Sequence, residues 1–300
     1  MLEHLLTEQS NPASERIDER TTSDILRIIN SEDAKVAGAV AQVVPSIAQA
    51  VDAIVDAFER GGHLFYIGAG TSGRLGVLDA AECSPTFDVP PEMVRGIIAG
   101  GEAALARAAE VTEDDPAMGA DDLRASGFTA NDVLVGIAAS GRTPYVLGAV
   151  TVANQMGALT IGISCTPDAD LSQVVKIPLV LLVGPEIVAG STRMKAGTAT
   201  KMVLNMLTTA SFIRLGYVFG NLMVNVQPKN SKLADRARRI ISKATGVPLE
   251  RAAELLKAGD NNVRVAITMA RAGVTREEAE RRLAAAGGRI SRALQESENG

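Results

Sequence analysis

The sequence predicts an α/β protein with a doubly wound, mostly parallel five-stranded sheet, preceded by helices and followed by a small all-helical domain. Three observations support this prediction. Short apolar runs rich in Val and Ile alternate with helical stretches in the middle of the chain, and glycine turns separate them. Apolar positions recur at three- and four-residue spacing at both ends, as in amphipathic helices.

The N-terminal part is expected to form an arm and then helices. Residues 1–20 are polar and show no period, so only packing or a partner would order them. Residues 21–246 form the predicted main domain. Between Ser23 and Glu59 the apolar spacing predicts two helices, which a Gly-Gly pair ends.

The middle of the chain supplies the predicted strands. Each run is nearly continuous in apolar residues, so both faces of the sheet should be covered. The five runs are 64–68, 94–99, 133–138, 159–164 and 177–183. In such a sheet ligands bind beyond the carboxyl ends of the strands, at a topological switch point. The loops after the strands should therefore hold the functional residues.

The C-terminal part is expected to be helical. Long helical patterns cover about 194–215 and 232–244, and Val247-Pro248 marks a boundary. Three or four short amphipathic helices follow, so 247–300 is predicted to be a small helical domain.

Composition and charge limit the possible functions. The chain has 300 residues, of which 46% are hydrophobic, and a formal net charge of −5. Its Lys and Arg residues are dispersed, so no nucleic-acid partner is expected. Cys83 and Cys165 are the only cysteines, too few for a disulfide framework or a zinc site. No segment resembles a signal peptide or a membrane span, so we expect a cytoplasmic protein without a membrane partner.

The first candidate ligand site is the segment LFYIGAGTSGR at 64–74, in which a strand runs into a glycine turn and a helix. Glycines allow close approach, a helix N-terminus attracts anions, and Thr71 and Ser72 add hydroxyl donors. The segment also matches the dinucleotide pattern G-x-G-x-x-G, a weak signal alone. However, Glu102, the first acid after the second strand, lies 34 positions beyond Gly68, whereas a dinucleotide site needs about 20.

A second turn of the same kind, AASGRTP at 138–144, follows the third predicted strand. Ser140, Gly141 and Thr143 would line it, and Pro144 suits the first turn of a helix. Two hydroxyl-rich turns at two strand ends fit one compact phosphate better than an extended pyrophosphate. The alternative, which spacing alone leaves open, is that these residues only cap helices.

Glu82 is the first candidate catalytic residue. Leu75, Leu78 and Glu82 are spaced i, i+3 and i+7, so the glutamate continues an apolar stripe and should be partly desolvated. Desolvation raises the pKa of a carboxyl group towards the range useful for a general acid. Pro85 is expected to end the helix just beyond, beside a loop. The alternative is a half-exposed glutamate in the last helical turn.

Glu113 is the second candidate, in the acidic cluster EVTEDDP. Clustered carboxylates raise one another's pKa values, so one can act as a base and another as an acid. The alternative is structural, since Thr112 and Asp115 match a capping box. The only histidines, His4 and His63, lie away from the strand-end loops, so acid–base chemistry falls to carboxylates.

Four motifs resemble the N-acetylmuramic acid 6-phosphate etherase family. They are GAGTSGRLG at 68–76, AECSPT at 81–86, AASGRTPY at 138–145 and GSTRMKAGT at 190–198. The resemblance covers nearly the whole chain. It implies a sugar isomerase (SIS) domain, whose Ser and Thr turns hold a sugar phosphate, and so implies Ser72, Ser140 and Thr143 as phosphate ligands.

The resemblance also implies a reaction that needs no metal or redox cofactor. The family removes D-lactate from N-acetylmuramic acid 6-phosphate, leaving N-acetylglucosamine 6-phosphate, in cell-wall recycling. In the open-chain sugar a base takes the C2 proton, an acid protonates the lactyl ether oxygen at C3, and water then adds. The resemblance assigns Glu82 as the acid and Glu113 as the base.

Further implied features are a homodimer and a segment, 190–201, that closes the pocket. Ser191 and Lys195 of this segment are candidate sugar or phosphate contacts, although Lys195 has the alternative role of pairing with a carboxylate. Two other functions stay open. A non-catalytic sugar-phosphate sensor would bind without turnover, and an aldose–ketose isomerase would share the phosphate turns and the C2 proton abstraction.

Overall fold

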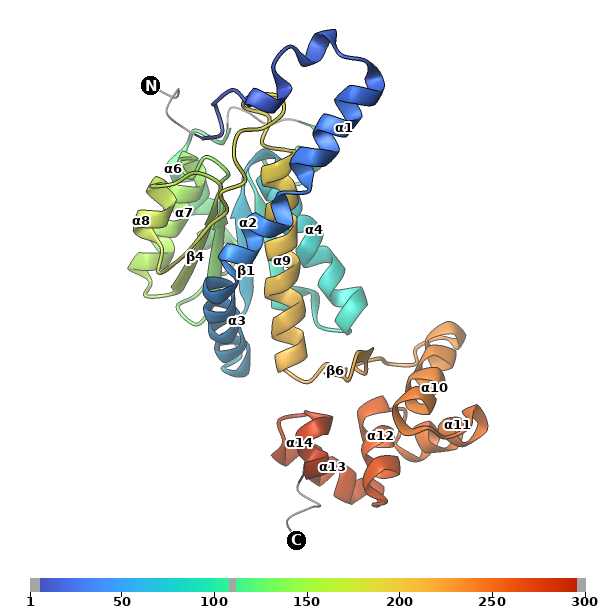
Figure 1. Cartoon of the computed structure of the whole chain (residues 1–300). Helices are drawn as coiled ribbons and strands as arrows, with labels where there is room; N and C mark the ends of the chain where they lie inside the picture. Colours follow the sequence, from blue (N-terminus) through green and yellow to red (C-terminus); the bar gives the residue numbers. More distant parts are fainter. Residues whose placement is uncertain (1–5, 108–111, 296–300) are drawn as a thin grey trace. The chain divides into compact units, whose positions relative to one another are not determined.

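The computed structural model describes residues 6–107 and 112–295, which form two compact units (Figure 1). The first unit comprises the residues up to 82 and residues 91–208. The second comprises residues 83–90 and those from 209 onward. Two helices, α4 (Gly70–Phe87) and α9 (Lys195–Arg214), have residues in both units.

The first unit is built on a parallel five-stranded sheet, as predicted. Its strands pair in the order β2-β1-β3-β4-β5. Their bounds are β1 Leu64–Gly68, β2 Val94–Ile98, β3 Val133–Ile137, β4 Leu159–Ser164 and β5 Ile177–Val180. β5 is shorter than the predicted 177–183 because its partner β4 ends at Ser164, whose carbonyl accepts the Leu181 amide at 2.7 Å.

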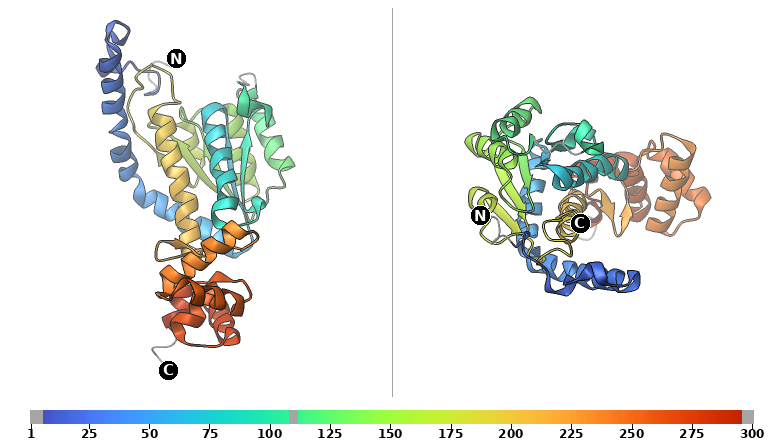
Figure 2. Two further views of the ribbon diagram at one scale, coloured as in Figure 1. Left: turned by 90° about the vertical axis from the view of Figure 1, so that its right-hand side faces the viewer. Right: turned by 90° about the horizontal axis from the view of Figure 1, so that it is seen from above.

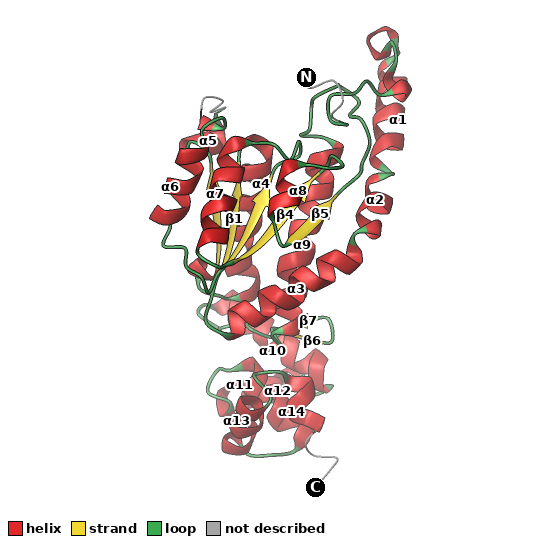
Figure 3. Cartoon of the chain, turned by 90° about the vertical axis from the view of Figure 1, so that its left-hand side faces the viewer, coloured by secondary structure: helices red, strands yellow, loops and turns green. Residues whose placement is uncertain are grey.

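Helices cover both faces of this sheet (Figures 2 and 3). α3 (Val44–Glu59), α4 and α9 lie over one face. The other face is covered by α6 (Pro116–Ala125), α7 (Pro144–Gln155) and α8 (Asp170–Val174). On that second face Phe65 and Leu134 are buried against Leu123 of α6 and Val146 of α7. The sheet is therefore covered on both sides, which explains its continuous apolar strands.

Among the described residues three α-helices precede the sheet, whereas the sequence predicts two. They are α1 (Thr22–Asp33), α2 (Val36–Gln42) and α3. α2 and α3 are separate because Pro45 lies in the first turn of α3, and proline cannot donate the backbone hydrogen bond that would continue α2. Two 3₁₀ turns, Pro12–Ser14 and Ile17–Glu19, lie in the predicted arm. A third 3₁₀ turn, Pro91–Met93, precedes β2, and the short helix α5 (Ala103–Ala106) follows β2.

α4 differs from the prediction at its end. It continues through Pro85 to Phe87. Proline removes one hydrogen bond of the helical ladder, but Pro85 does so only in the last turn. There Phe87 stacks on Phe212 with ring centroids 4.5 Å apart. The expectation that the helix ends at Pro85 is therefore wrong, and Glu82 lies within a continuous helix.

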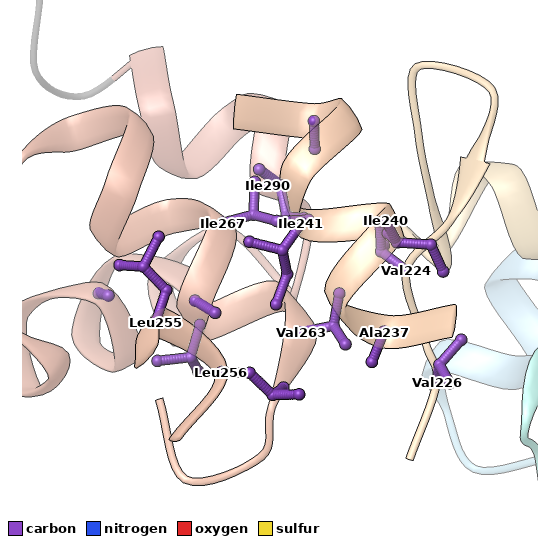
Figure 4. Close-up of a cluster of buried hydrophobic side chains, with 14 of the residues drawn as sticks. Val224, Val226, Ala237, Ile240, Ile241, Leu255, Leu256, Val263, Ile267 and Ile290 are labelled. Atoms are coloured by element: carbon purple, nitrogen blue, oxygen red, sulfur yellow. The ribbon is translucent and has the colours of Figure 1, made fainter. Parts of the chain in front are cut away.

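The described part of the second unit contains four short helices after α10 (Ser231–Thr245) and a two-stranded hairpin. The elements are α11 Leu249–Ala258, α12 Val263–Ala272, α13 Arg276–Ala285, α14 Ile290–Gln295, β6 Val218–Phe219 and β7 Leu222–Met223. Ile241 of α10 shares a buried cluster with Leu256 of α11 and Ile267 of α12 (Figure 4). Because α10 belongs to this core, the unit begins before the predicted boundary at Val247.

Candidate active site

The two hydroxyl-rich turns follow neighbouring strands. β1 and β3 pair in parallel along their full length, with Gly68 opposite Ile137. From β1 the chain moves to β2 on one side and then to β3 on the other, so the topological switch point lies between β1 and β3. Ligands of such sheets bind at this point. The structure thus places both turns where the sequence analysis expects a ligand.

The first turn presents hydroxyl groups at the start of α4. Thr71 and Ser72 are half-buried in its first helical turn. Gly73 is required beside them, because a Cβ there would lie 2.6 Å from the Gly68 carbonyl oxygen. In the described part of the chain, neither hydroxyl has a hydrogen-bond partner. Both remain available to an anion at the helix N-terminus.

The second turn is equally tight. Gly141 has φ +68°, and a Cβ there would lie 2.2 Å from the Ala169 side chain. Ser140 accepts a hydrogen bond from the Arg142 amide at 3.3 Å. Thr143 precedes α7 without a capping hydrogen bond from its side chain. The capping alternative therefore does not describe Thr143.

Glu113 lies beside the second turn. Its carbonyl oxygen accepts the Tyr145 amide at 3.1 Å, which fixes the segment to the start of α7. The cap of α6 is Asp115, which accepts hydrogen bonds from the Ala117 and Met118 amides at 2.8 and 3.3 Å. The structural alternative, a capping box starting at Thr112, is therefore wrong, since the helix begins later. The first two residues of the acidic cluster, Glu110 and Val111, lie outside the described residues, as does His4.

Glu82 lies apart from these groups. Ser72 and Glu82 are ten residues apart in one helix, which is about 15 Å along its axis. Glu82 is exposed and Leu78 is 53% exposed, so their stripe does not face the core. The expectation of partial desolvation is not met in the single chain. We call the surface formed by Leu75, Leu78, Glu82 and Lys201 the Glu82 face.

Ser191 and Lys195 lie in the segment that leads into α9. Ser191 is half-buried, and its amide donates to the Val188 carbonyl at 2.9 Å. Lys195 is 1% exposed, and its Nζ lies 2.6 Å from Glu32 Oε2. Of the two roles left open for Lys195, the structure shows the pairing with a carboxylate.

A buried polar cluster surrounds Lys195. Glu32 also accepts a hydrogen bond from Asn11 at 3.0 Å, and Glu186 accepts the Lys195 and Ala196 amides at 3.0 and 2.9 Å. We call Asn11, Glu32, Glu186 and Lys195 the arm cluster. Burial alone would raise the pKa of Glu32, but hydrogen bonds from Lys195, Lys35 and Asn11 outweigh it and lower the pKa to about 2. The described part of the predicted arm is thus ordered by its own chain.

Sequence reasoning missed a second polar network, on the inner side of α4. Asp79 is 6% exposed and accepts hydrogen bonds from Tyr66 at 2.9 Å and Asn205 at 2.7 Å. Burial raises the pKa of Asp79, although these bonds and the charge of Lys201 act against the rise. Asp79 precedes Glu82 by one helical turn. Two features of the sequence could have indicated this network. They are the one-turn spacing of Asp79 and Glu82, and the i, i+4 pair Lys201 and Asn205 on a predicted helix.

Other features of the described residues do not point to a different site. A polar cavity of about 450 Å³ lies in the second unit between Asn225, Lys229 and Arg264, and it contains none of the predicted site residues. Among the described residues no group of His, Cys, Asp or Glu is arranged to hold a metal ion. No single described helix is long and apolar enough to span a membrane.

Comparisons with known proteins show which family the chain resembles. Residues 46–154 match the family model of the glucokinase regulatory protein N-terminal SIS domain. The chain is 54% identical to N-acetylmuramic acid 6-phosphate etherase of Aeromonas hydrophila over 97% of both chains. It is 48% identical to the enzyme of that name from Clostridium beijerinckii, over 99% of this chain and 98% of the other.

Among solved structures, phosphoheptose isomerase of Neisseria gonorrhoeae shares the fold. It superposes with a TM-score of 0.51 at 18% sequence identity, over 64% of this chain and 98% of the other. This similarity concerns the fold of the sheet and its helices.

Proposed function

Since the chain belongs to the N-acetylmuramic acid 6-phosphate etherase family, we propose that it cleaves the D-lactyl ether of N-acetylmuramic acid 6-phosphate. The products are N-acetylglucosamine 6-phosphate and D-lactate. The reaction belongs to the recycling of cell-wall sugars, for which we propose a cytoplasmic location.

One observation supports the binding of a sugar phosphate above the others. The hydroxyl groups of Thr71, Ser72 and Thr143 stand at the switch point of the sheet without protein partners among the described residues. Unsatisfied donors at two adjacent helix N-termini suit the three oxygens of a phosphate monoester. Ser140 and Gly141 complete the second turn. The phosphate thereby fixes C6 of the sugar.

The chemistry requires a base at C2 and an acid at the ether oxygen on C3. In the open-chain aldehyde the C2 proton is acidic because it is α to the C1 carbonyl. Glu113, beside the second turn, takes this proton. Glu82 protonates the ether oxygen that leaves from C3, and in the second half of the reaction it activates the water that adds to C3.

A single chain does not bring Glu82 to the sugar. C2 and C3 are only a few bonds from C6, whereas Glu82 lies about 15 Å along α4 from Ser72. The carbonyl contact of Glu113 with Tyr145 keeps it near the turns. We therefore propose a homodimer in which the Glu82 face of one copy meets the turns and Glu113 of the other. Burial of the exposed Leu78 in that contact would supply the desolvation expected at Glu82.

The proposal is tested with purified protein and N-acetylmuramic acid 6-phosphate in D₂O. We expect release of D-lactate, together with N-acetylglucosamine 6-phosphate that contains deuterium at C2. The absence of D-lactate would refute the proposed function. Ketose formation from glucosamine 6-phosphate would instead identify an isomerase, and tight binding of the sugar phosphate without turnover would identify a sensor.

A further inference from the structure

A cavity adjoins Glu82, lined by residues of α4 and α9. Its volume is about 320 Å³, and Leu75, Leu78, Asp79, Glu82, Lys201 and Asn205 contribute to its lining. None of the residues that line the phosphate turns contributes to it. The cavity is therefore separate from the proposed phosphate site and lies beside Glu82, the candidate acid.

Lys201 brings an unpaired positive charge to this cavity. Its side chain is exposed, and within the described residues it makes neither an ion pair nor a hydrogen bond. The buried Asp79 accepts hydrogen bonds from Tyr66 at 2.9 Å and Asn205 at 2.7 Å, and Lys201 acts on it through its charge. The ammonium group remains free to bind an anionic ligand.

The other side chains that line the cavity include two leucines and an asparagine held by a hydrogen bond. Leu75 is half-buried and Leu78 is 53% exposed, so both present apolar surface to the cavity. Asn205 is held in place because its Nδ2 donates to Asp79. A ligand that fits these walls has a small apolar group and one negative charge on neighbouring atoms.

The leaving group of the proposed reaction has this chemistry. A lactyl ether joins its oxygen to a carbon that bears one methyl group and one carboxylate. If Glu82 reaches the ether oxygen, the carboxylate lies within two bonds of that contact, inside the same cavity. Once Glu82 has given its proton to the ether oxygen, two carboxylates lie in this small space, and a cation beside them offsets their repulsion.

We propose that Lys201 binds the lactyl carboxylate, while Leu75 and Leu78 contact the lactyl methyl group. This inference rests on the proposed function and extends it to substrate recognition. Lys201 is then a specificity residue, because it distinguishes a lactyl ether from an uncharged ether at the same carbon. It also offsets the repulsion between the departing lactate and Glu82.

The test compares two substrates with two variants. The substrates are N-acetylmuramic acid 6-phosphate and the same ether with the lactyl carboxylate replaced by its carboxamide. Lys201→Met should lower kcat/KM for the carboxylate substrate about 10–100-fold, the usual worth of a hydrogen bond to a charged group. The same variant should lower kcat/KM for the carboxamide less, by about 2–10-fold, because the amide oxygen still accepts a hydrogen bond from the ammonium group but carries no charge.

Two controls accompany the measurement. Lys201→Arg keeps the charge and should keep most of the preference for the carboxylate. Lys257→Met removes an exposed lysine of α11 and should leave kcat/KM unchanged for both substrates. A matched loss on both substrates in Lys201→Met, or no loss on the carboxylate substrate, would overturn the inference.

The wild-type protein in the same series separates this inference from the function on which it rests. If the wild type releases no D-lactate, the proposed function fails and the role of Lys201 fails with it. If the wild type is active and Lys201→Met keeps the wild-type ratio between the two substrates, only the role of Lys201 is refuted.

Discussion

Two lysines of α9 lie in opposite surroundings. Lys195, in the arm cluster, is 1% exposed and lies 2.6 Å from Glu32. Lys201, on the Glu82 face, is exposed and has no partner among the described residues. A buried charge must be paired to be tolerated, whereas an exposed charge costs little when unpaired. The comparison suggests that the arm cluster maintains the fold and that the Glu82 face serves the ligand.

The largest expected effect is on catalysis at the Glu82 face. Glu82→Gln keeps the shape of the side chain but removes its acid, so kcat should fall about 10²–10⁴-fold. The free energy of unfolding should change by less than about 0.5 kcal/mol, since no hydrogen bond or ion pair of Glu82 with a described residue is lost. Steady-state kinetics and urea unfolding measure the two quantities. Glu92→Gln, at another exposed position, is the matched control and should change neither.

The second effect is on stability in the arm cluster. Lys195→Met leaves Glu32 buried with its main partner removed, which typically costs about 3–5 kcal/mol. The urea midpoint should fall accordingly. A double variant that also replaces Glu32 with Leu should recover part of this loss. A Lys195→Met protein as stable as the wild type would show that the arm cluster does not hold the fold together.

The third effect is a dependence of stability on pH. The pKa of Glu32 is lowered from its usual value of 4.5 to about 2 in the folded protein. Its stabilisation is therefore complete above about pH 4.5 and is lost as the pH falls towards 2, by about 3 kcal/mol in all. Unfolding measured between pH 6 and pH 3 should show this slope in the wild type. In Glu32→Gln the slope should be reduced, and an unchanged slope would contradict the assignment to Glu32.

A smaller effect is expected beneath the Glu82 face. Asp79→Asn places an amide opposite the donors of Tyr66 and Asn205, which should cost about 1–3 kcal/mol in unfolding free energy. Tyr66→Phe removes one hydrogen bond and should cost about 1 kcal/mol. Thermal unfolding compares the two. A larger loss in Tyr66→Phe than in Asp79→Asn would show that Asp79 is not the centre of this network.

The smallest effect on stability is expected at Lys201. Lys201→Met should shift the free energy of unfolding by less than about 0.5 kcal/mol, because no contact with a described residue is lost. Chemical unfolding of Lys201→Met and of Lys195→Met, measured in parallel, compares two lysines of one helix directly. Equal losses in the two variants would remove the distinction between the arm cluster and the Glu82 face.

The sequence predicted the parallel sheet and the two turns well because their signals are local. Each turn is a contiguous strand, glycine and helix start, and Thr71, Ser72 and Thr143 lie within a few residues of their strands. Parallel pairing of β1 and β3 then brings the turns together without further information. The end of α4 was misjudged because Pro85 is tolerated in a last turn that Phe212 supports.

The surroundings of the ionisable groups were not predictable in the same way. The apolar stripe of Leu75 and Leu78 has the period of a core-facing helix, but the single chain leaves Leu75 half-buried and Leu78 exposed. Lys195 and Lys201 have the same side chain, and only the packing of α1 against the start of α9 buries one of them. Such contacts join residues far apart in the sequence, so no local pattern reports them.

A mixed dimer of two inactive chains examines the proposed sharing of one reaction centre between two copies. Glu82→Gln and Glu113→Gln chains with different tags are co-expressed, and the heterodimer is isolated and assayed for D-lactate release. If one chain supplies Glu82 and the other supplies the turns with Glu113, one of its two centres is intact, and it should recover about half of the wild-type activity. A heterodimer as inactive as both parents would show that each centre draws both glutamates from one chain.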